Sequence, residues 1–354
     1  MKLKTSITSI ALGAVLVALG VCAFVESPSA TPAPAPASAL LLNAAGATFP
    51  YPIYSKWFTE YNRLHPDIQI NYNSIGSGGG IRQLQAGTVD FGASDPPMTD
   101  GEMSQNKVPV LHFPTVLGAV VPTYNIEGVN QELNFTGEVL ADIFMGKITK
   151  WNDPALAGIN KGVNLPDTDI VVVHRSDGSG TSYVWTDFLS KVSTEWETKV
   201  GRNKSVNWPV GLGGKGNEGV SGLIKQTPGA IGYVELIYAV QNQLPYGRVK
   251  NSSGAFVKAD LAGVTAAAAS ESKKMPADFR VSITNASGKM AYPICSFTYL
   301  LIPSKIDDPA KKKALKDFLH WMLIDGQNDA EGLSYAKLPK DVVARELKAI
   351  AQIN

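Results

Sequence analysis

After residue 40, short apolar runs alternate with amphipathic stretches along the chain, a pattern typical of α/β proteins. Strands are expected over residues 68–72, 89–93, 116–124, 169–174, 231–235 and 294–302. Helices are expected over residues 51–64, 81–86, 137–145, 309–324 and 341–350, after residue 181 and from residue 220. The first of these helices has an apolar face made of Ile53, Tyr54, Trp57, Phe58 and Tyr61.

The two long apolar strands, 116–124 and 294–302, lie on either side of a self-contained block. If both are crossovers, lobe I comprises residues 41–120 with 293–354 and is discontinuous, and lobe II comprises residues 121–292. Two lobes joined by a two-segment hinge describe a protein that holds a ligand in the cleft between them.

Two stretches of the block predict little regular structure. Residues 211–219 resemble a glycine-rich turn, and residues 250–290 a polar, alanine-rich excursion.

Length and composition narrow the class of protein. A chain of 354 residues suits two domains, and 44% hydrophobic with 18% charged residues is typical of a soluble globular protein. The formal net charge of +1 argues against a nucleic-acid binder, which normally carries a basic stripe.

Residues 1–40 are expected to be a signal peptide followed by a Pro/Ala linker. Lys2 and Lys4 precede an apolar stretch over residues 7–21, and residues 27–37 are rich in proline and alanine. The mature protein is therefore expected to be periplasmic or otherwise extracytoplasmic. Ordinary cleavage of the signal peptide is favoured. A lipid anchor on Cys22 remains the alternative, although Val21 before the cysteine makes a poor lipoprotein cleavage motif.

Three short loops pair a hydroxyl residue with glycine or alanine, and each is expected to precede a helix. They are residues 46–49, 76–80 and 175–181. A helix start offers unpaired N–H groups, glycine lets the backbone approach a ligand, and a hydroxyl adds a donor. Together the three loops predict a site for a small oxyanion held without metal.

The third loop, residues 175–181, carries the most chemistry. Arg175 offers a planar fork for an oxyanion, Asp177 can hold that fork, and Ser179 and Thr181 can donate hydroxyl protons. An ordinary strand-to-helix turn capped by Ser or Thr accounts equally well for this segment alone.

Asp95 ends the strand at 89–93, where ligand sites of α/β proteins gather. A turn-forming Asp before proline is the simpler interpretation. An ionised carboxylate, however, only accepts hydrogen bonds, so it would welcome an oxyanion that carries a proton and repel one that carries none. Phosphate is protonated near neutral pH, whereas sulfate is not.

Metal, cofactor and enzyme interpretations find less support. The four histidines are scattered without ligand spacing, and Ser179 lacks the nucleophile-elbow motif. Cys295 stands in an apolar run, which favours a buried, inert thiol. We therefore expect no metal, no cofactor and no enzymatic activity.

The segments at residues 44–50, 89–95, 208–216 and 333–336, in this order, resemble the phosphate-binding proteins of bacterial high-affinity phosphate ABC transporters. The resemblance covers nearly the whole mature chain. It implies a type-II periplasmic binding-protein fold of two α/β lobes, which would capture inorganic phosphate and deliver it to the ABC transporter permease subunits in the inner membrane. It also implies that the protein acts as a monomer and binds no nucleic acid.

The resemblance further implies which residues contact phosphate, with Asp177 matching the acid that pairs with the arginine. His174 departs from the family, where a second basic residue often stands, and it would tune the potential of the cleft. Another tetrahedral oxyanion (arsenate or sulfate) and a phosphoryl-hydrolysing enzyme remain the alternatives. The implied contacts are Thr48, Phe49 through its backbone N–H, Ser77, Asp95, Arg175, Ser179, Gly180 and Thr181.

Overall fold

The computed structural model describes residues 39–129 and 131–354. Within these residues helices and strands alternate in a mixed α/β arrangement, which confirms the predicted class. The expected signal peptide, the linker and Cys22 lie outside the described residues. No helix in the described part of the chain is both long enough and apolar enough to cross a bilayer.

Eight strands form one mixed sheet, in the order β2-β1-β3-β11-β4-β8-β6-β7. On one side β1 runs parallel to β2 and β3, and on the other β6 runs parallel to β7 and β8, while β4 and β11 pair antiparallel between them. The strands are β1 (Leu40–Gly46), β2 (Ile68–Ser74), β3 (Phe91–Ser94), β4 (Val110–Asn125), β6 (Val171–Arg175), β7 (Leu212–Gly214), β8 (Ala230–Glu235) and β11 (Cys295–Pro303).

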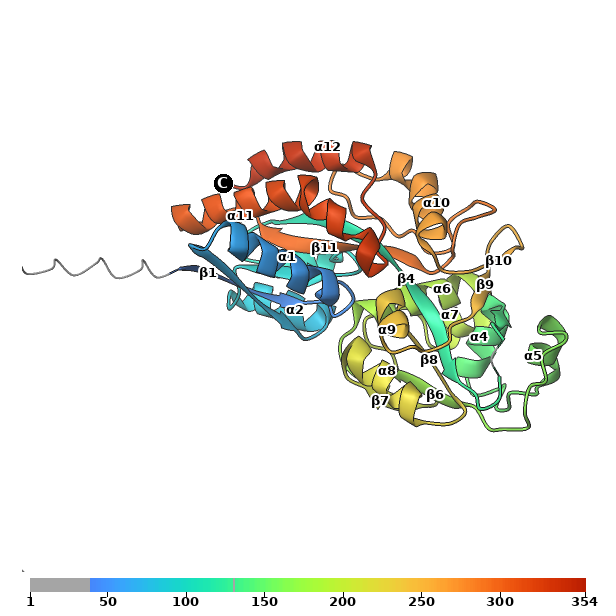
Figure 1. Cartoon of the computed structure of the whole chain (residues 1–354). Helices are drawn as coiled ribbons and strands as arrows, with labels where there is room; N and C mark the ends of the chain where they lie inside the picture. Colours follow the sequence, from blue (N-terminus) through green and yellow to red (C-terminus); the bar gives the residue numbers. More distant parts are fainter. Residues whose placement is uncertain (1–38, 130) are drawn as a thin grey trace, which may run out of the picture. The chain divides into compact units, whose positions relative to one another are not determined.

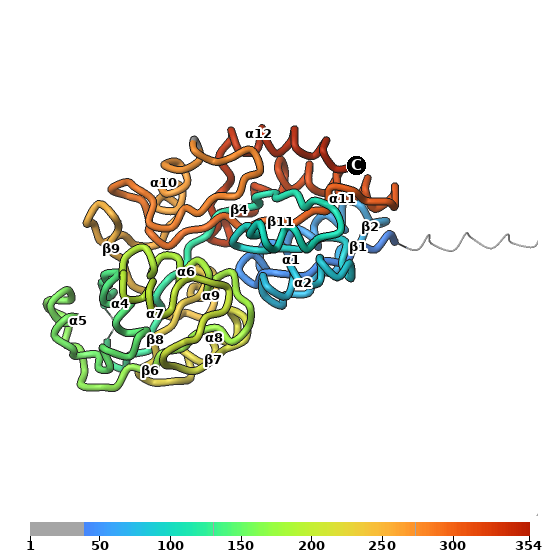
Figure 2. Tube along the Cα trace, turned by 180° about the vertical axis from the view of Figure 1, so that it is seen from behind, coloured from blue at the N-terminus to red at the C-terminus, as the bar shows by residue number. Residues whose placement is uncertain are grey.

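Strand β4 is shared by the two sides of this sheet. Its residues up to Ala119 pair with β11, and its residues from Val120 onward pair with β8. We call β2, β1, β3 and β11 the β1 half of the sheet, and β8, β6 and β7 the β6 half. Figures 1 and 2 show β4 passing from the elements around the β1 half to those around the β6 half.

The helices divide between the two halves. In Figure 1, α1, α2, α11 and α12 lie around β1 and β11, whereas α4 and α6–α9 lie around β6 and β8. A small sheet of β5 (Asn134–Phe135), β9 (Arg248–Lys250) and β10 (Phe256–Val257) accompanies the second group. The helices are α1 (Tyr51–Leu64), α2 (Ser77–Ala86), α3 (Asp100–Ser104), α4 (Gly137–Phe144), α5 (Pro154–Ile159), α6 (Gly180–Val192), α7 (Thr194–Lys199), α8 (Gly216–Gln226), α9 (Leu236–Gln241), α10 (Leu261–Glu271), α11 (Pro309–Ile324) and α12 (Lys340–Ala349).

Helix α1 follows the predicted bounds, and its five expected apolar residues are the buried ones. Its Phe58 and Tyr61 pack on Phe318 of α11, with ring centroids 5.5 and 5.2 Å apart. The indole of Trp57 donates a hydrogen bond of 2.7 Å to the carbonyl of Gly326. The period of the pattern therefore predicted both the helix and the face that meets the core.

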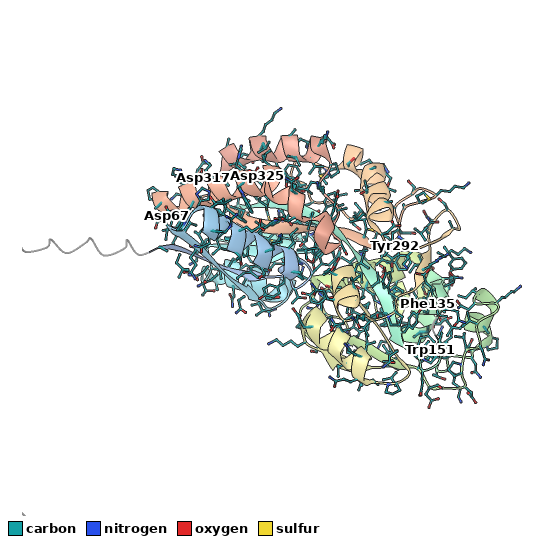
Figure 3. All side chains as sticks on the ribbon, viewed as in Figure 1. Asp67, Phe135, Trp151, Tyr292, Asp317 and Asp325 are labelled. Carbon is teal, nitrogen blue, oxygen red and sulfur yellow. The ribbon has the colours of Figure 1, made fainter. Side chains whose placement is uncertain are left out.

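The β6 half has an aromatic core of its own. Tyr124 of β4 lies with its ring centroid 6.0 Å from those of both Phe135 and Trp151, which Figure 3 labels. The Trp151 indole donates to the Gly229 carbonyl at 3.0 Å, so its one polar atom is satisfied in the interior.

Several predicted bounds were wrong at glycine-rich segments. The helix expected over residues 81–86 begins at Ser77, and the helix expected from residue 220 begins at Gly216. The predicted turn over residues 211–219 holds strand β7 and the first turn of α8. Packing overrides the low helix and strand propensity of glycine here.

Two further segments differ from expectation. Strand β4 begins at Val110, six residues before the predicted start. Pro114 lies inside this strand, and proline normally argues against a central strand, so the pattern did not reveal its first part. Residues 250–290 include helix α10. Its alanines leave no distinct apolar face, so the pattern did not predict this helix. Cys295 is buried as expected, and its thiol contacts the Tyr292 carbonyl at 3.2 Å.

The lobe boundaries at 120/121 and 292/293 stay a prediction. The paired course of β4 and β11 is compatible with them, since these two strands join segments far apart in the sequence. Tyr292, labelled in Figure 3, donates to the Val120 carbonyl at 3.0 Å, so the two proposed crossing points are in contact.

Two glycines give a paired test of the packing. Gly222 lies inside α8 and a Cβ built on it would meet nothing within 4 Å, so G222A should raise the free energy of unfolding by about 1 kcal/mol. A Cβ on Gly232 of β8 would lie 2.7 Å from the Val173 carbonyl oxygen and from the Ile224 side chain. G232A should therefore destabilise the fold by about 1–3 kcal/mol. Urea unfolding checks both, and a destabilised G222A would contradict the described helix.

Candidate functional site

The predicted site residues follow the carboxyl ends of strands on both halves of the sheet. Thr48 and Phe49 follow β1, and Asp95 follows β3. Ser77 begins the helix after β2, whereas the segment from Arg175 to Thr181 joins β6 to α6. In α/β folds the carboxyl ends of parallel strands are where ligand sites form, so strand direction gathers Thr48, Ser77 and Asp95 within the β1 half and residues 175–181 within the β6 half.

The loop between β1 and α1 is fixed by tyrosine hydroxyls from distant segments. Tyr238 of α9 donates to the Thr48 carbonyl at 2.6 Å, and Tyr335 donates to the Phe49 carbonyl at 2.6 Å. In a trans peptide the N–H points opposite to the C=O. The hydroxyl of Tyr238 therefore fixes the direction of the Phe49 N–H, the group that the family resemblance assigns to the ligand.

Arg175 and Asp177 form a forked ion pair. The Arg175 Nε and Nη2 atoms lie 2.8 and 2.6 Å from the two Asp177 carboxylate oxygens. Burial alone would raise the pKa of Asp177, but the Arg175 guanidinium holds that pKa below its ordinary value. Asp177 also accepts from the Gly216 N–H at 3.1 Å. The expectation that Asp177 holds the arginine agrees with this geometry.

The direction of two threonine hydroxyl protons is set by the groups that donate hydrogen bonds to those hydroxyls. Thr48 Oγ1 accepts from the Asn217 side-chain amide at 2.7 Å and from its backbone N–H at 3.3 Å. Thr181 Oγ1 accepts from the same amide at 3.1 Å and from Arg175 Nη1 at 3.2 Å. A hydroxyl has two lone pairs and one proton. With both lone pairs engaged, each of these threonines can act only as a donor to a ligand.

Two serines are arranged in a similar way. Ser77 Oγ accepts from the backbone N–H of Asp95 at 3.2 Å, and Ser179 Oγ caps α6 by accepting from the Ser182 N–H at 3.0 Å. Gly180 and Thr181 occupy the first two helical positions of α6, whose N–H groups have no partner within the helix. The site therefore offers hydroxyl and backbone donors from several elements.

Asp95 is the acceptor in this cluster of donors. Its side chain is 1% exposed, and its Oδ1 accepts from the Thr298 hydroxyl at 3.0 Å. The other oxygen, Oδ2, is buried without a hydrogen-bond partner. Burial raises the pKa of Asp95 to about 7, against the lowering effects of Thr298 and Arg175. A buried acceptor without a donor is costly, so its presence points to a group that brings a proton.

The two halves of the sheet meet at glycines around the site. The Gly78 N–H of α2 donates to the Gly178 carbonyl at 2.8 Å. A Cβ built on Gly180 would collide with both Asp95 Oδ2 and Ser77 Oγ. Nearby, Lys204 and Glu102 of α3 form an ion pair at 2.8 Å. Gly180 of the β6 half thus lies directly beside Asp95 and Ser77 of the β1 half.

Sequence reasoning missed three polar residues of this region. Asn217 and Glu235 lie fully buried, Asn217 contacts both Thr48 and Thr181, and Thr298 orients Asp95. Glu235 Oε2 accepts from the Ile237 N–H at 2.8 Å, and burial raises its pKa well above the ordinary value. Asn217 lay within a segment interpreted as a turn, while Thr298 and Glu235 lay within apolar runs, so no local signal marked them.

His174 is placed differently from its expected role. Its ring stacks on Trp208 at a centroid distance of 4.8 Å, and its Nδ1 lies 3.0 Å from the Arg175 carbonyl oxygen. Burial lowers the pKa of His174, so at neutral pH the ring is uncharged and adds little to the potential. Among the described residues, no group of three or more His, Cys, Asp or Glu side chains is arranged to hold a metal ion.

Together the fold and the cluster of donors define a solute-binding protein of the type-II periplasmic class. The model of the PBP superfamily domain matches residues 29–325. Phosphate-binding protein PstS of Xylella fastidiosa (strain Temecula1) is 46% identical over 303 residues, which are 85% of this chain and 82% of that protein. The PstS of Pasteurella multocida is 46% identical over 305 residues, 86% and 88% of the two chains. The chain belongs to this family of phosphate-binding proteins, which are transport proteins and not enzymes.

Solved structures show the same fold at lower identity. A phosphate ABC transporter substrate-binding protein from Clostridium perfringens, with bound phosphate, has a TM-score of 0.62 at 19% identity, covering 85% of this chain and 100% of that one. The phosphate-binding protein from Stenotrophomonas maltophilia has a TM-score of 0.66 at 18% identity, covering 88% and 94%. These likenesses confirm the predicted type-II fold.

The Asp95 environment yields a titration prediction. In the protein free of added anions, the carboxyl should titrate near pH 7, as followed by its ¹³C chemical shift. T298V removes the hydroxyl that stabilises the ionised form, so the pKa of Asp95 should rise further. T123V serves as the control, because it removes a buried hydroxyl elsewhere, that of Thr123 in β4, which donates to the Pro245 carbonyl. An unchanged pKa in T298V would contradict the arrangement.

Proposed function

We propose that this chain captures one inorganic phosphate ion in the cluster formed by Thr48, Phe49, Ser77, Asp95, Arg175, Ser179, Gly180 and Thr181. The observation that carries the proposal is the buried, unpartnered Oδ2 of Asp95 among hydroxyls set to donate. Phosphate needs donors for its bare oxygens and an acceptor for its remaining proton. The names of the relatives at 46% identity support the same ligand.

The charge balance supports capture of a small ion at close range. Asp177 neutralises Arg175, and ionised Asp95 adds a negative charge, so the buried charged groups of the site carry no excess of positive charge. Affinity then comes from a full set of oriented dipoles in a dry environment, where hydrogen bonds to a charged group are strong. Such a site favours the ion that matches its pattern of donors and acceptor.

The surrounding roles follow from the family. The protein would be the substrate-binding component of an ABC transporter, acting outside the cytoplasm after removal of the signal peptide. It would hand phosphate, as a monomer, to the permease subunits in the inner membrane. A lipid on Cys22 would tether it there, whereas the Pro/Ala linker would give the tether length.

Selectivity between phosphate and sulfate tests the proposal. Calorimetric titration at about pH 8, where Asp95 is mostly ionised, should show phosphate binding and far weaker sulfate binding, since sulfate has no proton to give. Arsenate should compete with phosphate because it is also protonated. Tight sulfate binding at this pH, or no phosphate binding, would overturn the proposal.

The pH dependence of sulfate binding is the matching control. Below its pKa of about 7, Asp95 carries a proton and becomes a donor to a bare oxygen. Sulfate affinity should therefore rise by roughly a hundredfold from two pH units above that pKa down to it, and then level off. In D95N the amide can donate at every pH, so this dependence should disappear. A sulfate affinity that does not vary with pH in the unaltered protein would contradict the role given to Asp95.

Gly180 tests the position of the ligand. The methyl group of G180A would collide with Asp95 Oδ2 and Ser77 Oγ, so both side chains would have to move and phosphate binding should be lost. Calorimetry measures the loss, and circular dichroism checks the fold. G222A, where the added methyl meets empty space, should bind phosphate normally. Undiminished phosphate binding by folded G180A would place the ligand elsewhere.

A further inference from the structure

Asn217 is the residue that joins the donors of the two halves of the sheet. It is fully buried near the start of α8. Its Nδ2 donates both to Thr48 Oγ1, at 2.7 Å, and to Thr181 Oγ1, at 3.1 Å. Thr48 follows β1 of one half, whereas Thr181 begins the helix after β6 of the other. The family resemblance does not assign Asn217 to the ligand.

The orientation of this amide is fixed by its other end. Asn217 Oδ1 accepts from the backbone N–H of Glu235 at 2.9 Å. A backbone N–H can only donate, so the oxygen of the amide must face Glu235 and the NH₂ group must face the threonines. The amide cannot flip without placing two N–H groups against each other.

This fixed amide decides the sense of the hydrogen bonds at the ligand. Because Asn217 donates to both threonine hydroxyls, neither can turn its own proton toward Asn217. The Arg175 Nη1 atom, 3.2 Å from Thr181 Oγ1, excludes a second direction for the proton of Thr181. The backbone N–H of Asn217, 3.3 Å from Thr48 Oγ1, does the same for Thr48. Each hydroxyl proton is therefore left to point away from these N–H donors.

We propose that Asn217 is a positioning residue that makes the hydroxyls of Thr48 and Thr181 obligatory donors, so that the site favours an oxyanion carrying a single proton. This inference rests on the proposed phosphate function. A hydroxyl that is free to rotate could accept from a second ligand proton. With both threonines fixed as donors, Asp95 is the acceptor that takes the one proton of the ligand.

A double-mutant cycle separates this role from a general contribution to packing. N217A should weaken phosphate binding by about ten- to a hundredfold, the loss expected when hydrogen bonds to a charged ligand lose their orientation. In a T48V/T181V background the hydroxyls are already absent, so adding N217A should cost little further affinity. An equal loss in both backgrounds would show that Asn217 acts through packing and would overturn the inference.

Side-chain volume provides a second comparison. N217D keeps the shape of the side chain but puts an acceptor against both threonines, which would turn their protons away from the ligand. It should therefore bind phosphate more weakly than N217A, although N217A leaves the larger cavity. The added carboxylate also repels an anion directly, and this effect persists in the T48V/T181V background. Only the part of the N217D loss that disappears in that background supports the inference, and an equal loss in both backgrounds would overturn it. Because N217D retains the volume, it also serves if N217A folds poorly.

Asn160 offers a matched control. It is also buried, donates through Nδ2 to two carbonyls, those of Asn134 and Leu156, and accepts through Oδ1 from the Asn134 N–H at 2.7 Å. N160A and N160D should lower the unfolding midpoint without changing phosphate affinity. If the unaltered protein fails to bind phosphate, the proposed function itself is wrong. If it binds and the Asn217 variants bind equally well, only the role of Asn217 is wrong.

Discussion

The constraint on which the site depends is the sense of each hydrogen bond rather than its length. Oxygen atoms dominate the cluster, and a hydroxyl can serve a ligand as donor or acceptor. N–H groups, which can only donate, engage the oxygens of Thr48, Ser77, Ser179 and Thr181. On Thr48 and Thr181 two N–H donors occupy both lone pairs, so in the proposed site only their hydroxyl protons remain for the ligand. A single carboxylate oxygen, Oδ2 of Asp95, is an acceptor among these donors, and in the proposed site it would meet the proton of the ion.

The packing of the surrounding fold offsets the free energy that it costs to bury these polar groups. A buried ion pair and an unpartnered carboxylate each carry a desolvation penalty. The aromatic cores in the two halves of the sheet, around Phe318 and around Tyr124, provide packing against which these groups are held. Strand β4, buried along nearly its whole length, links the two cores within one hydrogen-bonded sheet. The polar groups of the site are thus fixed by elements that do not touch the ligand.

Much of the fold could be read from the chain because its signals are local. The period of residues 51–64 and 309–324 defined α1 and α11, and short apolar runs marked most strands. Predictions failed where glycine stands in regular structure, as at the start of α2 and in β7, because glycine has weak intrinsic preferences and packing decides.

The residues of the site likewise divide into those with a local sequence signal and those without one. The resemblance identified residues in recognisable loops, and the structure gathers them, although their contacts with phosphate remain a proposal. Asn217, Glu235 and Thr298 could not be found, since their importance lies in which distant group they face. Hydrogen bonds such as that between Asn217 and Thr48 join residues 169 apart in the chain. No window of sequence contains that information.

The contact between Gly78 and Gly178 has a consequence for the history of the chain. A Cβ on Gly78 would lie 3.2 Å from the Cα of Gly178, and a Cβ on Gly178 would lie 3.3 Å from the Cα of Gly78. Neither position can accept a side chain while the other backbone stays where it is. Although the two glycines are a hundred residues apart, selection for glycine at each is therefore set by the backbone of the other, whatever residue the other position carries.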